Sequence, residues 1–229
     1  MRTIGLIGGM SWESTITYYQ LLNEGVKDAL GGLHSVKVLL YSVDFFEIES
    51  LMSRGDWDQA ADLLGGVAAR LEAAGADFIL ICTNTLHKVA PQVQERIRVP
   101  LVHIAEAAAE RLQEQKITRV GLLGTKYTMT QEFYRDKLTE RGIEVLIPEG
   151  EDIDLVNRVI FDELCLGVVK EDSRAAYLRV IAALQQRGAQ GILLGCTELG
   201  LIVSGEDVSL PLFDTTEIHA KKALRLALE

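Results

Sequence analysis

"ADFILICTNT" (residues 76–85) is the stretch that decides the fold, because "AQGILLGCTE" (residues 189–198) repeats its pattern in the second half of the chain. In both stretches a short apolar run ends in a cysteine, and a threonine follows. Apolar runs of this length, bounded by glycine and separated by longer helical patterns, are typical of buried parallel strands in βα units.

Two further blocks recur in the same order. "RTIGLIGGMSWEST" (2–15) matches "TRVGLLGTKYTMTQ" (118–131), and "PLVHIAEAAAERL" (100–112) matches "PLFDTTEIHAKKA" (211–223). We therefore expect an α/β fold of two similar lobes, each a small parallel β-sheet flanked by helices. The predicted lobes are residues 1–103 with 211–229, and residues 104–210. We expect a pseudo-twofold axis to relate them, with the active site in the cleft between.

The first lobe can be divided into elements from its own pattern. Apolar runs predict strands at 3–8, 37–44 and 77–82. Ser11 has the side chain of an N-cap for a helix that extends to Leu30, and a second helix is expected from Trp57 to Gly75.

Composition excludes several classes of partner. The chain has 229 residues, 48% hydrophobic and 24% charged, and a formal net charge of −10 without a basic patch. This argues against nucleic acid or an anionic membrane as the main partner. No apolar run reaches the roughly 20 residues that span a bilayer, and the N-terminal apolar run is too short for a secretory signal. We expect a cytoplasmic protein.

The pattern of the three cysteines indicates a catalytic role rather than a disulfide framework. An odd count without a CxxC pair fits neither a disulfide scaffold nor a standard zinc site. Ligands of parallel α/β sheets gather beyond the carboxyl ends of the strands, where Cys82 and Cys196 are expected. Two thiols on opposite sides of a carbon could remove a proton from one face and return one to the other. Cys165 has no counterpart in the repeat and is interpreted as structural.

A thiol needs help to act as a base, since its ordinary pKa is about 8.5. Helix N-termini next to the strand ends favour an anion, and short donors follow both cysteines: Thr83, Asn84, Thr85 and Thr197. The glycine turns at 7–11 and 123–128 offer N–H groups to a carboxylate. Their spacing is not GxGxxG, so a dinucleotide cofactor is not expected.

The motifs "GLIGGMSWEST" (5–15), "CTNTLHKVA" (82–90) and "GCTEL" (195–199) together resemble the aspartate/glutamate racemase family, most closely its broad amino-acid racemase branch in enteric bacteria. The resemblance covers essentially the whole chain. It implies a cofactor-free enzyme, independent of pyridoxal phosphate, that racemises a small acidic amino acid as a homodimer. It places the paired acid and base on Cys82 and Cys196.

The resemblance also implies the residues around the substrate. The expected contacts to the amino-acid carboxylates and amine are Met10, Ser11, Thr83, Asn84, Thr85, Thr125, Thr128 and Thr197. Arg54 and Lys170 match basic positions of the family, and His87 and Glu198 are expected to support the thiols. Cell-wall glutamate racemases instead open with an Asp-Ser-Gly type turn and carry "GCTH", so a dedicated peptidoglycan role is not implied.

Three alternatives remain open at this point. A maleate isomerase on the same scaffold also keeps two thiols, whereas an arylmalonate decarboxylase type keeps one. A ligand-binding sensor would use the cleft without turnover. A zinc site from Cys82, Cys196 and His87 ranks last, because it lacks ligand spacing and a fourth ligand.

Overall fold

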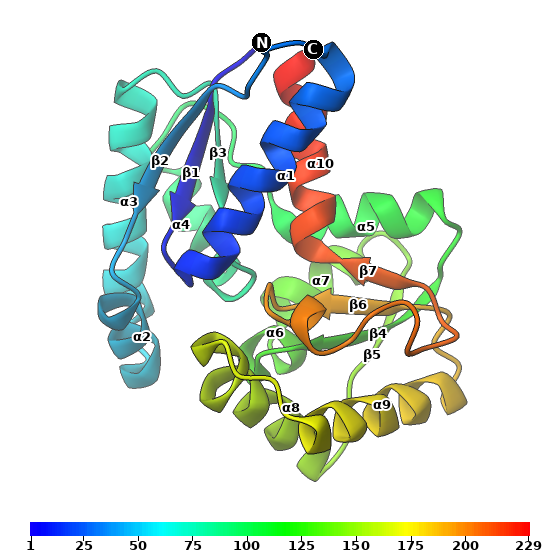
Figure 1. Ribbon diagram of the computed structural model, residues 1–229. Coiled ribbons are helices and arrows are strands. Elements are labelled where there is room, and N and C mark those ends of the chain that lie inside the picture. The colour runs from blue at the N-terminus through cyan, green and yellow to red at the C-terminus, as the bar shows by residue number, and fades with distance from the viewer. The chain divides into compact units, whose positions relative to one another are not determined.

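The structure, a computed structural model, describes residues 1–229 (Figure 1). The chain forms two compact units. The first contains Met1–Ile104 and Thr216–Glu229, and the second contains Ala105–Thr215. Each unit is built around one parallel sheet, and the two are described in turn.

The first unit contains a three-stranded sheet in the order β2-β1-β3. Its strands are β1 (Ile4–Gly8), β2 (Val38–Ser42) and β3 (Phe78–Ile81), all parallel, and Ile4 pairs with both Val38 and Phe78. Every residue of β1 and β3 is buried, as expected for strands covered on both faces. An isolated parallel bridge joins Ile79 to Leu101 and extends the order by one position.

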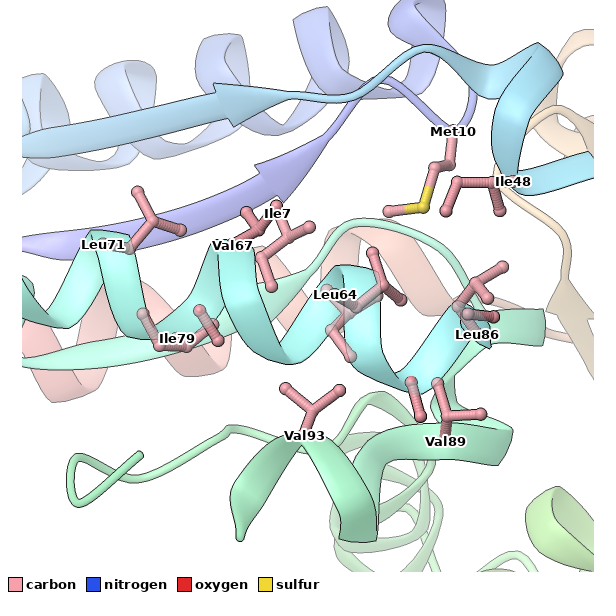
Figure 2. Close-up of a cluster of buried hydrophobic side chains, with 14 of the residues drawn as sticks. Ile7, Met10, Ile48, Leu64, Val67, Leu71, Ile79, Leu86, Val89 and Val93 are labelled. Atoms are coloured by element: carbon pink, nitrogen blue, oxygen red, sulfur yellow. The ribbon is translucent and has the colours of Figure 1, made fainter. Parts of the chain in front are cut away.

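Helices cover both faces of this sheet. The helix α3 (Trp57–Ala73) packs on one face, where Leu64, Val67 and Leu71 lie in one cluster with Ile7 and Ile79 (Figure 2). The helices α1 (Trp12–Leu30) and α10 (Thr215–Leu228) cover the other face (Figure 1). A short 3-10 turn, η1 (Thr85–Val89), and α4 (Ala90–Gln94) follow β3.

The helix between β2 and α3 is not among the elements expected from the sequence. It is α2 (Phe45–Arg54). The Asp44 side chain caps its first turn by accepting from the Phe46 N–H at 3.1 Å, and Gly55 ends it in the left-handed conformation at φ 72°. These two capping residues are the signal in the sequence for this helix.

The second unit contains a four-stranded parallel sheet in the order β5-β4-β6-β7. Its strands are β4 (Arg119–Gly124), β5 (Glu144–Leu146), β6 (Ile192–Gly195) and β7 (Leu212–Asp214). The helices α8 (Glu151–Asp162) and α9 (Glu171–Gln186) pack on one face. On the other face lie α5 (Ile104–Glu114) and α7 (Glu132–Thr139) (Figure 1). An ion pair of 2.7 Å between Lys137 and Glu106 joins these two helices. Three short pieces complete the unit: α6 (Lys126–Thr130), η2 (Leu164–Leu166) and η3 (Leu199–Leu201).

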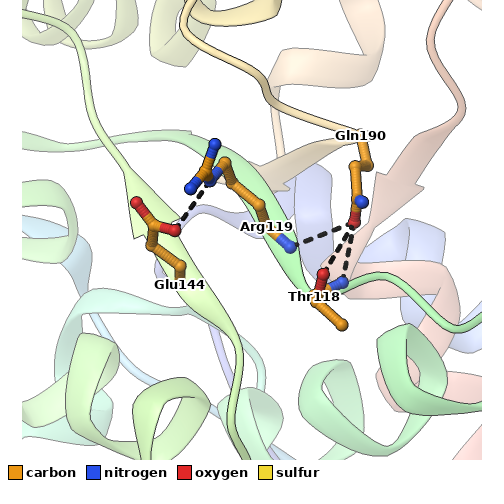
Figure 3. A network of polar contacts seen from close by, with 4 residues as sticks. All are labelled: Thr118, Arg119, Glu144 and Gln190. Carbon is orange, nitrogen blue, oxygen red and sulfur yellow. Dashed lines mark hydrogen bonds and ion pairs between the residues drawn. The ribbon is translucent and has the colours of Figure 1, made fainter.

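A polar network fixes the amino ends of the strands in this sheet (Figure 3). The Gln190 side-chain oxygen accepts from the backbone N–H groups of Thr118 and Arg119 at 2.8 and 3.2 Å. Arg119 donates in turn to the Glu144 carboxylate at 2.7 Å. The network sets the register of β4 against its two neighbours at the end opposite to Cys196.

The expected α/β fold with two similar sheets is confirmed. In each unit the central strand comes first in the chain, the next strand lies on one side, and the cysteine-bearing strand lies on the other. The expected boundary at residue 211 differs from the structure. Strand β7 pairs with β6 in the second unit, through Leu212 with Ile192, so the chain returns to the first unit at Thr216.

The packing of α3 predicts a large cost for removing one of its leucines. Leu64 is fully buried in the cluster of Figure 2, so Leu64→Ala should lower the free energy of unfolding by about 2–5 kcal/mol. Its neighbour Leu63 is only half-buried, and Leu63→Ala should cost clearly less. Urea unfolding of the two variants tests this, and equal losses would contradict the packing described.

Candidate active site

The turn after β1 brings a helix start to the carboxyl end of the first sheet. Gly9 has a φ of +90°, and a Cβ there would lie 2.2 Å from the Val43 carbonyl oxygen, so only glycine fits. The Gly9 N–H donates to the Thr15 hydroxyl at 2.8 Å. Ser11 caps α1 by accepting from the Ser14 N–H at 3.4 Å, as its sequence position predicts. Met10 and Ser11 are both buried in this turn.

Cys82 lies at the same edge of the sheet, immediately after β3. Its N–H donates to the Ile7 carbonyl at 2.9 Å, which holds it beside the end of β1. The side chain is fully buried in an apolar cluster with Leu80, Tyr18 and Ala220. Burial raises the pKa of the Cys82 thiol well above its ordinary value, so the thiol is neutral near pH 7.

Three predicted substrate contacts, Thr83, Asn84 and Thr85, follow Cys82 directly. Asn84 and Thr85 are buried at the start of η1. His87 holds this segment in place through hydrogen bonds to the backbone. Its Nε2 accepts from the Ile104 N–H at 3.2 Å, so Nδ1 carries the proton and donates to the Thr83 carbonyl at 2.8 Å. Both ring nitrogens are thus occupied by the backbone, and His87 orients the loop rather than exchanging protons.

A second buried histidine, His219 of α10, lies beside His87. It is not among the site residues predicted from the sequence. Its Nε2 donates to the Val102 carbonyl at 2.8 Å, so Nδ1 accepts from the Tyr18 hydroxyl at 2.7 Å. The rings of His87 and His219 lie 5.8 Å apart. Burial, together with the neighbouring His87, lowers the pKa of His219 to about 3. No motif marks His219, because a single histidine within a helical pattern carries no distinctive spacing.

The second unit repeats the turn with hydroxyl groups. Thr125 caps α6 by accepting from the Thr128 N–H at 3.3 Å, and the two hydroxyls lie 3.2 Å apart. Both threonines are buried. The preceding Gly124 pairs with Gly195, and a Cβ on Gly124 would lie 2.8 Å from the Gly195 carbonyl oxygen. The two strand ends therefore approach closely just before Cys196.

Cys196 follows β6 in a setting unlike that of Cys82. Its Sγ donates to a Glu198 carboxylate oxygen at 3.0 Å, and the Thr197 hydroxyl donates to the same oxygen at 2.7 Å. Glu198 is itself buried. Burial is the main cause of a raised pKa at Cys196, and the negative charge of Glu198 adds to it. A hydrogen bond thus links the Cys196 sulfur to a buried carboxylate.

Arg54, Lys170 and Cys165 lie outside the turns and strand ends described above. Arg54 is the exposed last residue of α2. Lys170 precedes α9 and forms an ion pair with Glu163 at 3.2 Å. Cys165 lies in η2 and packs against the same apolar cluster as Cys196.

Two classes of feature are absent from the structure. No group of three or more His, Cys, Asp or Glu side chains is arranged to hold a metal ion. None of the helices has the length and apolar character needed to cross a membrane.

Comparisons with known proteins agree on one family. Residues 7–223 match the family described as Asp/Glu/Hydantoin racemase. A protein from Yersinia pestis, provisionally named an Asp/Glu racemase, is 55% identical with a TM-score of 0.95, over 100% of both chains. An aspartate racemase homologue from Pyrococcus horikoshii OT3 is 37% identical with a TM-score of 0.87, again over 100% of both chains. The broad specificity amino-acid racemase RacX of Bacillus subtilis is 23% identical over 96% of each chain.

The buried His219 predicts acid-sensitive stability. Its pKa is about 3 in the folded chain and about 6.5 when unfolded, so the unfolded state binds the proton more tightly between these values. Stability should therefore fall as pH drops below 6.5, by about 2 kcal/mol at pH 5 from this group. In His219→Gln the difference in unfolding free energy between pH 7 and pH 5 should shrink by that amount.

Urea unfolding at the two pH values measures this difference. His34→Gln is the matched control, because His34 is exposed, and it should keep the wild-type pH dependence. An unchanged pH dependence in His219→Gln would contradict a neutral, buried His219.

Proposed function

The chain belongs to the Asp/Glu/hydantoin racemase family, and on that premise we propose that it interconverts the L and D forms of an acidic amino acid, with Cys82 and Cys196 as paired acid and base. One observation carries the proposal. In each unit a cysteine is the first residue after the strand that pairs with the central strand, at the carboxyl edge of the sheet. The proposal uses no pyridoxal phosphate: the thiols move the proton, and hydrogen-bond donors at the sheet edges stabilise the enediolate.

The proposed step moves one proton at each face of the substrate. One cysteine, as thiolate, takes the α-proton: the C–H bond breaks, an S–H bond forms, and the electron pair passes into the carboxylate as an enediolate. The other cysteine, as thiol, then protonates the opposite face of the α-carbon and becomes the thiolate. The exchanged protonation pattern suits the reverse reaction.

The unequal surroundings of the two thiols suggest their resting protonation. Cys82, in its apolar cluster, is held as the thiol and is suited to donate first. Cys196 donates a hydrogen bond to the Glu198 carboxylate at 3.0 Å, which gives its proton a path away from the sulfur. We therefore propose that Cys196 is the first base and that Glu198 accepts the Cys196 proton when the thiolate forms.

Substrate binding is proposed to use the groups at the two sheet edges. An α-proton of an amino acid is very weakly acidic, so preorganised donors must stabilise the enediolate, and this is usually the largest catalytic effect. The two capped helix starts, at Ser11 and Thr125, provide N–H groups and hydroxyls for a carboxylate. The further proposed contacts are Met10, Thr83, Asn84, Thr85, Thr128 and Thr197, with Arg54 and Lys170 toward the side-chain carboxylate.

Proton NMR in D₂O tests the proposed activity. The purified protein is mixed with L-aspartate or L-glutamate without cofactor, while the α-proton signal and the optical activity are followed. Loss of both supports the racemase. Turnover of maleate without α-proton exchange would instead indicate an isomerase of the maleate type, and binding without exchange would indicate a sensor.

The two-thiol assignment predicts unequal effects of three substitutions. Cys82→Ala and Cys196→Ala should each lower racemisation by at least about a thousandfold, because each removes an acid–base group. Cys165→Ala should keep nearly the full rate and serves as the control for loss of a thiol. Similar rates in all three variants would rule out the two-base mechanism.

Glu198→Gln separates two roles of this carboxylate. If Glu198 accepts the Cys196 proton, the variant should lose about a hundredfold or more in kcat, since an amide cannot take that proton. If Glu198 acted only by repelling the thiolate, its neutralisation would lower the pKa of Cys196 and raise the rate. The exposed Glu206→Gln controls for the change in net charge.

A further inference from the structure

The lysine proposed to meet the substrate side chain already has a carboxylate partner. Lys170 Nζ lies 3.2 Å from a Glu163 oxygen, and the Ser173 hydroxyl donates to the other Glu163 oxygen at 2.7 Å. The Lys170 side chain is 59% exposed, whereas that of Glu163 is only 12% exposed. The carboxylate is therefore the fixed member of the pair, and the lysine is the one that can turn toward another anion.

Glu163 keeps its negative charge in this position. The hydrogen bond from Ser173, with the contact from Lys170, holds the pKa of the Glu163 carboxyl below its ordinary value. It belongs to the turn between α8 and η2, and Ser173 lies in the first turn of α9. A resident anion thus occupies the N-terminal end of α9, where an incoming carboxylate would otherwise be favoured.

The face of α9 that carries Ser173 also meets the apolar cluster against which Cys196 packs. Lys170, Ser173 and Tyr177 follow one another at spacings of three and four, which places them on one side of the helix. Tyr177 is fully buried in the apolar cluster against which Cys196 also packs. The Lys170–Glu163 pair therefore lies about two helical turns from the residue that meets the cluster around Cys196.

We propose that Glu163 is a specificity-determining residue that restrains the preference for acidic amino acids by holding Lys170 in an ion pair. This inference rests on the proposed racemase function and on Lys170 as a contact for the side-chain carboxylate. An aspartate side chain must share Lys170 with a resident carboxylate of the same charge. An uncharged side chain of the same shape meets no such repulsion, so the enzyme accepts both classes.

L-Aspartate and L-asparagine form the matched substrate pair, because they are nearly isosteric and differ in side-chain charge. The measurement is the ratio of kcat/KM for α-proton exchange in D₂O with the two substrates. Glu163→Gln keeps an acceptor for Ser173 and removes the charge, so it should raise the aspartate-to-asparagine ratio about tenfold or more. Lys170→Met should lower the ratio by a similar factor.

Glu171→Gln is the matched control. Glu171 lies beside Lys170 at the start of the same helix and carries the same charge, but its side chain is 84% exposed and pairs with Arg174 instead, at 3.9 Å. Its substitution should leave the ratio within about twofold of the wild type. A general weakening of the fold would lower exchange with both substrates and leave the ratio unchanged.

The outcomes separate the two levels of the proposal. An unchanged ratio in Glu163→Gln, or an equal rise in Glu171→Gln, overturns the role of Glu163 while the racemase stands. If Glu163→Gln does not fold, an unchanged ratio in Lys170→Met, whose side chain is largely exposed, overturns the proposal by itself. Exchange of neither substrate by the wild type overturns the proposed function and this inference with it.

Discussion

The close approach of strand ends is the constraint on which the candidate site depends. Gly124 and Gly195 face each other across β4 and β6 with no room for a Cβ, and Gly8 leaves space for the Thr15 side chain in the first unit. In each unit the paired strands end together. Cys82 and Cys196 are the first residues after β3 and β6, so each lies at the carboxyl edge of its sheet, beside the start of a helix. The cysteines and their hydroxyl neighbours are positioned by backbone pairing, before any side-chain contact contributes.

The two thiols share a position but differ in their environment. Cys82 is surrounded by apolar side chains, whereas Cys196 donates to a buried carboxylate that also accepts from Thr197. Burial disfavours the thiolate at both positions, and at Cys196 the negative charge of Glu198 adds to this effect. A repeated backbone therefore holds two thiols in chemically unequal surroundings.

Much of the fold could be predicted from sequence because the repeat and the apolar runs are local signals. The strands that end in a glycine turn or at a cysteine, and their recurrence in the second unit, follow from the matched blocks of sequence. Long-range contacts left no such signal: His219 meets Tyr18 across 201 residues, and β7 pairs with β6 after an irregular segment. The ion pair between Lys170 and Glu163 was equally hidden, because neither spacing nor composition shows which acid a surface lysine meets.

The first unit is discontinuous in sequence, and this affects the order in which the protein can be completed. Residues 105–215 form a continuous unit, and they are translated before residues 216–229, which complete the first unit. Until then, the face of β1 and β3 that carries Cys82 lacks Ala220, Ala223 and His219, and the backbone bond from Arg2 to Ala227 cannot form. The cluster of apolar side chains around Cys82 is thus completed by a segment that is synthesised after the second unit, so a chain truncated before α10 cannot enclose Cys82.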